Sequence, residues 1–82
     1  MIDYIIITLK DIDGEKTLFK MKKTSRMTKM FEAYSVRMNT PVSNLQFILN
    51  GEKIEDSNAT PMSLELESDD VINVRRIAQH IG

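Results

Sequence analysis

Two hairpin signals stand on either side of one amphipathic segment, and few small folds accommodate that order. Asp13-Gly14 and Asn50-Gly51 are the turn signals, because both dipeptides favour the positive φ angles of tight turns. The segment between them repeats apolar residues at spacings of three and four, which is typical of a helix that buries one face. One helix packed against strands from two hairpins is therefore expected.

The strands are predicted from runs of β-branched and aromatic residues. Residues 4–9 are almost continuously apolar, so this strand is expected at the centre of the sheet. Residues 17–22 alternate with a period of two, which places Thr17, Phe19 and Met21 on one face. Further strands are predicted over 45–49, 52–54 and 71–74.

The helix is predicted to run for about three turns between residues that can cap its start and a proline, Pro41, that stops it. Asn39 is expected to close it in the left-handed conformation. A loop with at most one helical turn is expected over 61–66. The apolar stripe comprises Met27, Met30, Phe31, Tyr34 and Met38, and the capping hydroxyls belong to Thr24 and Ser25.

These elements predict an α+β chain in which the helix lies across one face of a mixed sheet of four to five strands. The element order is ββαββ, a short turn, and β, with the first and last strands parallel at the centre. This is the β-grasp, or ubiquitin-like, fold. A chain of 82 residues holds one domain, here residues 1–75, and residues 76–82 are expected to form a flexible tail.

The sequence contains few residues of the types that carry out catalysis. There is no cysteine to act as a nucleophile or metal ligand, and the only histidine, His80, falls in the predicted tail. The acidic pairs Glu55-Asp56 and Asp69-Asp70 are interpreted as turn residues and solvated charge, not as a metal site or an acid–base pair. We therefore expect no enzyme activity, no catalytic residue, no metal and no cofactor.

Charge is distributed unevenly along the chain. Residues 1–41 carry eight basic and five acidic residues, whereas residues 42–82 carry three basic and seven acidic residues. This asymmetry indicates two faces with different partners. No apolar run approaches the roughly 20 residues of a membrane span, and no basic leader precedes the first strand. A soluble, monomeric intracellular protein without a membrane partner is expected.

A cluster of basic residues runs from the second strand into the start of the helix, where it can meet phosphate groups. The chain as a whole is slightly acidic, however, and the pattern lacks exposed aromatic residues on which bases stack. Direct binding of nucleic acid is therefore not expected. The cluster comprises Lys20, Lys22, Lys23, Arg26 and Lys29.

The second strand, if it is an edge strand, offers unpaired backbone groups to an added strand. A shallow apolar groove is predicted between this strand and the helix. Such a groove selects a short aliphatic peptide flanked by acidic or phosphorylated residues, because charge steers its approach and orientation. The alternative is that the floor residues belong wholly to the core. The predicted floor is Phe19, Met21, Met30 and Tyr34, and the predicted rim is Lys20, Lys22, Lys29 and Arg37.

Several segments, in order and over residues 4–74, resemble the family of small ubiquitin-like modifiers, SUMO. Phe19-Lys20-Met21-Lys22 is similar to the Phe-Lys-aliphatic-Lys motif of that family's second strand. The helix residues 27–30 and 33–37 resemble its lysine-rich helix with a tyrosine and a following arginine. Residues 45–51 and 60–74 resemble its third strand and its acidic closing segment.

The resemblance implies a modifier whose C-terminal glycine, here Gly82, is joined to target lysines. It further implies nuclear and cytoplasmic location in a eukaryotic cell. The implied partners are the activating and conjugating enzymes, a SUMO protease, covalent target proteins, and readers with SUMO-interacting motifs that add a strand beside the second strand. The implied reader groove is Thr17, Phe19, Lys20, Met21, Lys22, Lys29, Met30, Tyr34 and Arg37, and the implied conjugating-enzyme face is Gly51, Lys53, Asp69 and Asp70.

The C-terminal residues depart from the family pattern. Mature modifiers end in two glycines, whereas this sequence ends in Ile81-Gly82. A branched side chain at the penultimate position would obstruct the narrow enzyme channels that a glycine passes. The Ile-Gly ending resembles an Ile-Gly-Gly end that stops one glycine short, which is the interpretation preferred here. Two alternatives stay open. One is an unconjugated SUMO-like interaction domain that binds the conjugating enzyme or repair and chromatin factors. The other is a β-grasp sulfur carrier, which also needs two glycines and leaves the Phe-Lys-Met-Lys motif unexplained.

Overall fold

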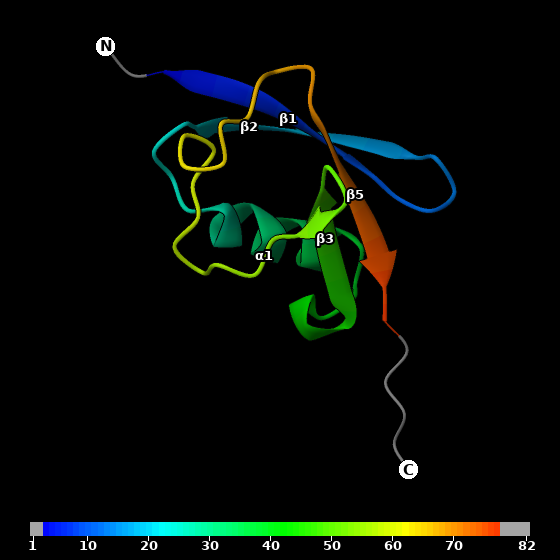
Figure 1. Ribbon diagram of the computed structural model, residues 1–82. Coiled ribbons are helices and arrows are strands. Elements are labelled where there is room, and N and C mark those ends of the chain that lie inside the picture. The colour runs from blue at the N-terminus through cyan, green and yellow to red at the C-terminus, as the bar shows by residue number, and fades with distance from the viewer. Residues whose placement is uncertain (1–2, 78–82) are drawn as a thin grey trace.

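The protein folds into two layers, a five-stranded sheet and one helix that covers one of its faces (Figure 1). The computed structural model describes residues 3–77. No helix within that range is long and apolar enough to cross a membrane. The elements are β1 (Tyr4–Lys10), β2 (Lys16–Lys22), α1 (Met27–Arg37), a 3₁₀ turn (Val42–Asn44), β3 (Leu45–Leu49), β4 (Glu52–Lys53) and β5 (Val71–Arg76).

The strands lie in the order β2-β1-β5-β3-β4, so the first and last strands are neighbours inside the sheet and β2 lies at one edge. β1 and β5 run parallel, with Thr8 opposite Val71, whereas β1 and β2 form an antiparallel hairpin. Both predicted turns contain positive φ angles, at Gly14 and at Asn50-Gly51. The predicted β-grasp architecture is confirmed.

The core lies between α1 and the covered face of the sheet. Alternation along β1 points Ile5, Ile7 and Leu9 toward the helix, where each is at most 2% exposed. The intervening Tyr4 and Ile6 face the opposite side and are about half exposed. The near-continuous apolarity of β1 therefore reflects its interior position in the sheet order but not burial on both faces.

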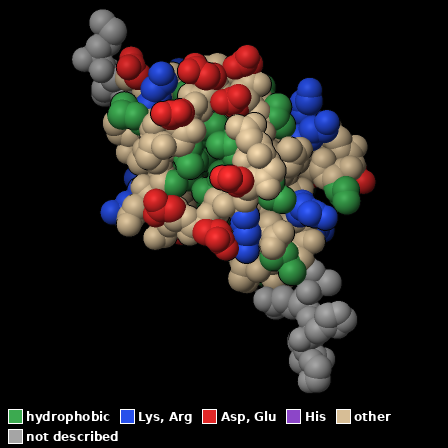
Figure 2. Space-filling view, in the orientation of Figure 1, with side chains coloured by type: hydrophobic (Ala, Val, Ile, Leu, Met, Phe, Trp, Pro, Cys, Tyr) green, Lys and Arg blue, Asp and Glu red, His purple; other side chains and the backbone are tan. Residues whose placement is uncertain are grey.

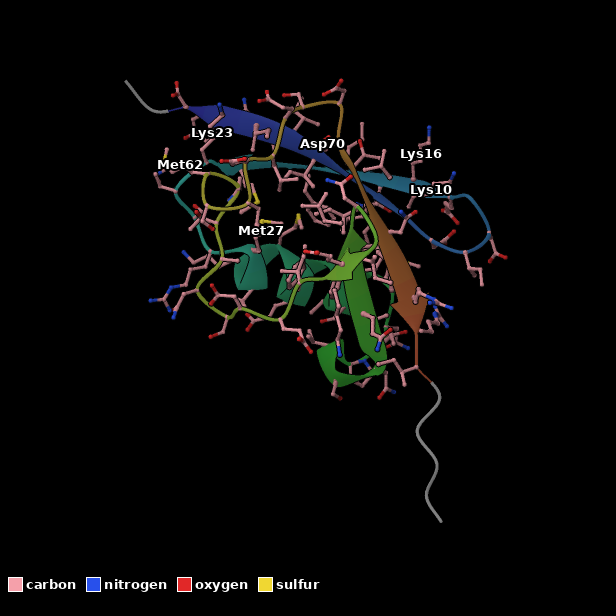
Figure 3. All side chains as sticks on the ribbon, viewed as in Figure 1. Lys10, Lys16, Lys23, Met27, Met62 and Asp70 are labelled. Carbon is pink, nitrogen blue, oxygen red and sulfur yellow. The ribbon has the colours of Figure 1, made fainter. Side chains whose placement is uncertain are left out.

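The start of α1 is held by a distant segment and not by the predicted hydroxyl caps. Arg26 occupies the N-cap position and makes no side-chain cap bond. The first helical N–H, of Met27, donates to the carbonyl of Ala59 at 2.8 Å. Close by, the N–H of Met62 donates to the carbonyl of Lys23 at 3.0 Å (Figure 3). The loop before β5 thus supplies the cap, which local sequence could not reveal.

The end of α1 follows the prediction. Asn39 adopts a left-handed conformation with φ of 52°. Its N–H donates to the carbonyl of Val36 at 3.1 Å, and the N–H of Thr40 donates to that of Ser35 at 2.9 Å. These two bonds are the Schellman pattern, which satisfies carbonyls that the helix leaves free.

Asn39→Ala is expected to lower the free energy of unfolding by about 1 kcal/mol, because alanine lacks the local hydrogen bonding that lets asparagine tolerate positive φ. Asn39→Gly is the matched variant and should be neutral or slightly stabilising, since glycine adopts this conformation without strain. Urea unfolding of the two variants checks the difference. Equal stability of both would contradict the role assigned to the left-handed residue.

One strand is longer than expected. β5 continues through Arg76, because Arg75 and Arg76 pair with Gln46 and Leu45 of β3, and the N–H of Ile77 donates to the carbonyl of Asn44 at 2.8 Å. Residues 61–65 form turns within a loop, as expected, and the N–H of Leu64 donates to the carbonyl of Thr60 at 3.0 Å. The predicted tail residues 78–82, with His80 and Gly82, lie outside the described residues.

Candidate functional site

An open groove lies between the edge strand β2 and the helix, with a volume of about 380 Å³. Its position is the one predicted from the sequence, and it brings together six of the nine residues predicted for the reader groove. Strand residues form one wall and helix residues the other. The lining residues are Phe19, Lys20, Met21, Lys22, Ser25, Lys29, Met30 and Ala33.

The groove floor is apolar and only partly open. Phe19 and Met21 are half-buried and pack against the core, so each presents an edge to solvent. Met30, at 4% exposure, belongs almost entirely to the core and offers little surface. Phe19 and Met21 therefore form a partly exposed floor, whereas Met30 belongs to the core. The strand residues supply contact area, and Met30 supports them from the helix.

The backbone of β2 pairs with β1 along one edge, and no strand within the described sheet pairs with its other edge. Alternate residues of an edge strand direct N–H and C=O groups outward, where an added strand can bind them. This free edge lies beside the groove. The arrangement presents backbone hydrogen-bonding groups and apolar surface to the same ligand.

Two exposed lysines border the groove, Lys22 from β2 and Lys29 from α1. Lys20 also lines it, but its ammonium nitrogen lies 5.0 Å from the centre of the Tyr4 ring, and Tyr4 is on the opposite face of the sheet. A cation over an aromatic ring is held there electrostatically. The positive rim of the groove thus comprises Lys20, Lys22 and Lys29, and the two strand lysines reach it from the outward face of β2.

Tyr34 does not line the groove, although the sequence placed it on the floor. It is 2% exposed and lies edge-on beneath Phe19, with ring centres 6.3 Å apart. Burial raises the pKa of its phenol, and the Asp11 carboxylate raises that pKa further while Arg76 opposes the shift. The phenol lines a second hollow of about 280 Å³ at the β1–β2 hairpin. Tyr34 thus supports the groove from below.

Thr17 and Arg37 also lie outside the groove lining. Thr17 is half-buried opposite Leu9 near the hairpin end, and Arg37 is exposed in the last turn of α1. Two lining residues, Ser25 and Ala33, were not predicted. Ala33 follows Lys29 by four residues and so shares its helix face, a spacing that would have identified it. Ser25 lies in the turn between strand and helix.

The second predicted face, Gly51, Lys53, Asp69 and Asp70, gathers at one end of the sheet. Ile48 lies opposite both Lys53 and Asn73, so the β3–β4 turn and the residues before β5 meet there. The Asp70 carboxylate accepts a bond from the Glu67 N–H at 2.8 Å, as expected of a turn residue. Figure 2 shows acidic side chains around a hydrophobic patch on this side of the molecule.

The centre of that patch is a hollow of about 310 Å³ with Leu49, Ile54 and Leu64 in its lining. Lys53 lies at its rim, where its ammonium is 3.5 Å from a carboxylate oxygen of Glu55 and both side chains are exposed. Exposed pairs of this kind contribute little to stability. Within residues 3–77, no three acidic or histidine side chains are arranged to hold a metal ion.

Comparison with known proteins shows what this chain is similar to. The model of a family described as Ubiquitin-2 like Rad60 SUMO-like matches residues 5–75. The small ubiquitin-related modifier of Caenorhabditis elegans is 36% identical over 72 residues, which are 88% of this chain and 78% of that protein. A de novo designed protein based on ubiquitin has a TM-score of 0.76 at 15% identity, over 96% of this chain and 95% of that one. The last likeness concerns the fold alone.

Proposed function

This chain belongs to the SUMO-like family of ubiquitin-like proteins, and we propose that it acts as a SUMO-type protein modifier. In this proposal the C-terminal glycine of the mature protein is joined to lysines of target proteins by activating and conjugating enzymes, and a SUMO protease removes it. The protein works in the nucleus and cytoplasm of a eukaryotic cell. The module itself catalyses nothing, and its surfaces are read by other proteins.

The observation that carries the proposal is the groove beside the free edge of β2. An extended peptide that pairs with this edge would form backbone hydrogen bonds with the outward N–H and C=O groups of β2, as in other strand-addition complexes. Every second side chain of the peptide would point toward the helix side and cover Phe19 and Met21. Acidic or phosphorylated residues beside the aliphatic core would face Lys22 and Lys29.

The acidic end of the sheet is proposed as the surface that binds the conjugating enzyme without a covalent bond. Its exposed Gly51 and Lys53 lie at the sheet end where Asp69 and Asp70 enter β5. Gly51 and Lys53 belong to the β3–β4 edge, opposite to β2, whereas the start of β5 is separated from β2 by β1 alone. A reader and the enzyme could therefore bind the same molecule at once.

Mass spectrometry of the natural protein from its source cells tests the covalent part of the proposal. After proteolysis, target lysines should carry the C-terminal segment of this chain through an isopeptide bond. A sample treated with a SUMO protease before digestion is the control and should lose these branched peptides. A protein found only in free form would contradict conjugation, and the groove would then serve an unattached interaction domain.

A further inference from the structure

The helix α1 covers only one face of the sheet (Figure 1). The other face carries large apolar side chains in contact with solvent. Tyr4, Ile6 and Leu18 are 50%, 47% and 62% exposed. Ile6 lies opposite Lys20, and Leu18 lies opposite Thr8, so Ile6 and Leu18 are diagonal neighbours on one face. The three residues, here called the outer stripe, lie on one face of β1 and β2, with the Lys20 ammonium 5.0 Å from the centre of the Tyr4 ring.

The strand pairing restricts what can cover the outer stripe. β1 is hydrogen-bonded to β2 on one side and to β5 on the other, so the middle of this face has no free backbone edge. An extended segment laid across it would leave its own N–H and C=O groups without partners away from water, which is costly. A helix satisfies its backbone internally, and we therefore expect a helical occupant.

The dimensions of the outer stripe fit such a helix. From Tyr4 to the level of Thr8 and Leu18 the stripe spans four residue steps, or about 13 Å at the usual strand rise. This length corresponds to about two and a half helical turns. A helix with apolar residues at i, i+4 and i+7 would place one side chain over each member of the stripe.

The charged residues beside the outer stripe indicate which charge the flank of that helix should carry. Lys16, Lys20 and Lys22 are exposed on the same face of β2 as Leu18. At the hairpin end Lys10 lies directly opposite Lys16 (Figure 3). β1, β2 and β5 contain no acidic residue. Acidic residues precede β5 on the other side of β1, so a negative helix flank would be repelled there and attracted along β2.

We propose that the outer stripe binds an amphipathic helix of a partner protein, with aliphatic residues over Tyr4, Ile6 and Leu18 and acidic residues along the lysines of β2. This surface goes beyond the groove, because its apolar residues lie on the opposite face of the sheet, while Lys20 and Lys22 border both surfaces. A strand added at the free edge of β2 would extend the sheet and leave the stripe open. Face-to-face packing of two copies is disfavoured, because it would oppose like charges.

The test uses a synthetic helical peptide of about 18 residues, or five turns, with leucines at i, i+4, i+7 and i+11 and glutamates along one flank. Amide NMR spectra of the labelled protein should shift at the outward residues of β1 and β2. Affinity should fall about tenfold or more in the Ile6→Thr/Leu18→Thr variant, because two aliphatic contacts are lost. Threonine keeps the strand preference of the replaced residues.

Ile12→Thr is the matched control, since Ile12 is 86% exposed in the hairpin loop and outside the stripe; it should bind as the original does. A peptide with lysines in place of the glutamates should bind about tenfold more weakly or worse.

The acid-flanked aliphatic peptide of the groove should keep its affinity for the double variant, which separates this site from the proposed function. If the double variant fails to fold, Leu18→Thr alone at the exposed edge carries the test.

Several results would overturn the proposal. They are shifts confined to the groove, equal affinity for the double variant, and no shift at millimolar peptide. Binding of a single-stranded oligonucleotide to the same residues in place of the peptide would also overturn it. So would a concentration-dependent dimer in sedimentation that Leu18→Thr abolishes, because the occupant would then be a second copy of this chain.

Discussion

Phe47→Ala is expected to lower the free energy of unfolding by about 3–5 kcal/mol. Phe47 is 4% exposed, and its ring stacks on Phe31 with centres 3.9 Å apart and planes at 11°. Tyr34 meets the same ring edge-on at 6.0 Å. The substitution removes the ring through which β3 contacts two residues of α1, and a cavity would remain between the two layers.

The loss is large relative to the total stability of a domain of this size, which is about 4–12 kcal/mol. Urea unfolding followed by circular dichroism measures it. Val36→Ala is the matched control, because Val36 is 79% exposed on the same helix that packs over Phe47; it should change stability by no more than about 0.5 kcal/mol. A change below about 1 kcal/mol for Phe47→Ala would show that the aromatic cluster is not the centre of the core.

Lys22→Glu and Lys29→Glu are each expected to weaken binding of an aliphatic peptide with acidic flanks by about tenfold at low salt. Each substitution replaces attraction at the groove rim with repulsion. Because salt screens exposed charges, the affinity difference between variant and original should shrink as ionic strength rises. Isothermal titration calorimetry at two salt concentrations measures both effects.

Lys10→Glu is the matched control for these variants. Lys10 is exposed at the far end of β1, outside the groove lining, yet the substitution changes the net charge by the same amount. At an ionic strength of about 0.1 M it should leave affinity within about twofold of the original, since exposed charges beyond the Debye length of about 10 Å are screened. An equal loss in all three variants would mean that overall charge, and not the groove rim, governs binding.

The sequence predicted those parts of the fold that depend on neighbours along the chain. Alternation fixed which face of β2 carries Phe19 and Met21, because side chains of a strand point to opposite faces in turn. Asn39 was assigned correctly because its left-handed conformation ends the helix through local hydrogen bonds. The edge position of β2 was only a condition in the sequence analysis, and the strand order of the structure supplies it.

The missed features depend on residues distant in sequence. The carbonyl that caps α1 belongs to Ala59, more than thirty positions after Met27, so no local pattern encodes it. Tyr34 lies on the predicted apolar face of the helix. Periodicity does not say whether such a residue lines the groove or is buried beneath it. Lys20 lines the groove in the structure, and the position of its ammonium over Tyr4 is a feature that the sequence did not indicate. Ile6 is exposed because the helix covers only one face of the sheet. An apolar run in the sequence does not indicate whether one face of a strand is covered or both.

One measurement tests the central claim most directly, namely that a peptide adds as a strand to the free edge of β2. The experiment uses the labelled protein and an unlabelled peptide of three or four aliphatic residues with adjacent acidic residues. Isotope-filtered NMR then detects contacts between the two backbones. We predict cross-strand contacts along Lys16–Lys22, with side-chain contacts to Phe19 and Met21. Contacts confined to the acidic end of the sheet or to the outward residues of β1, or no binding at millimolar peptide, would contradict the account.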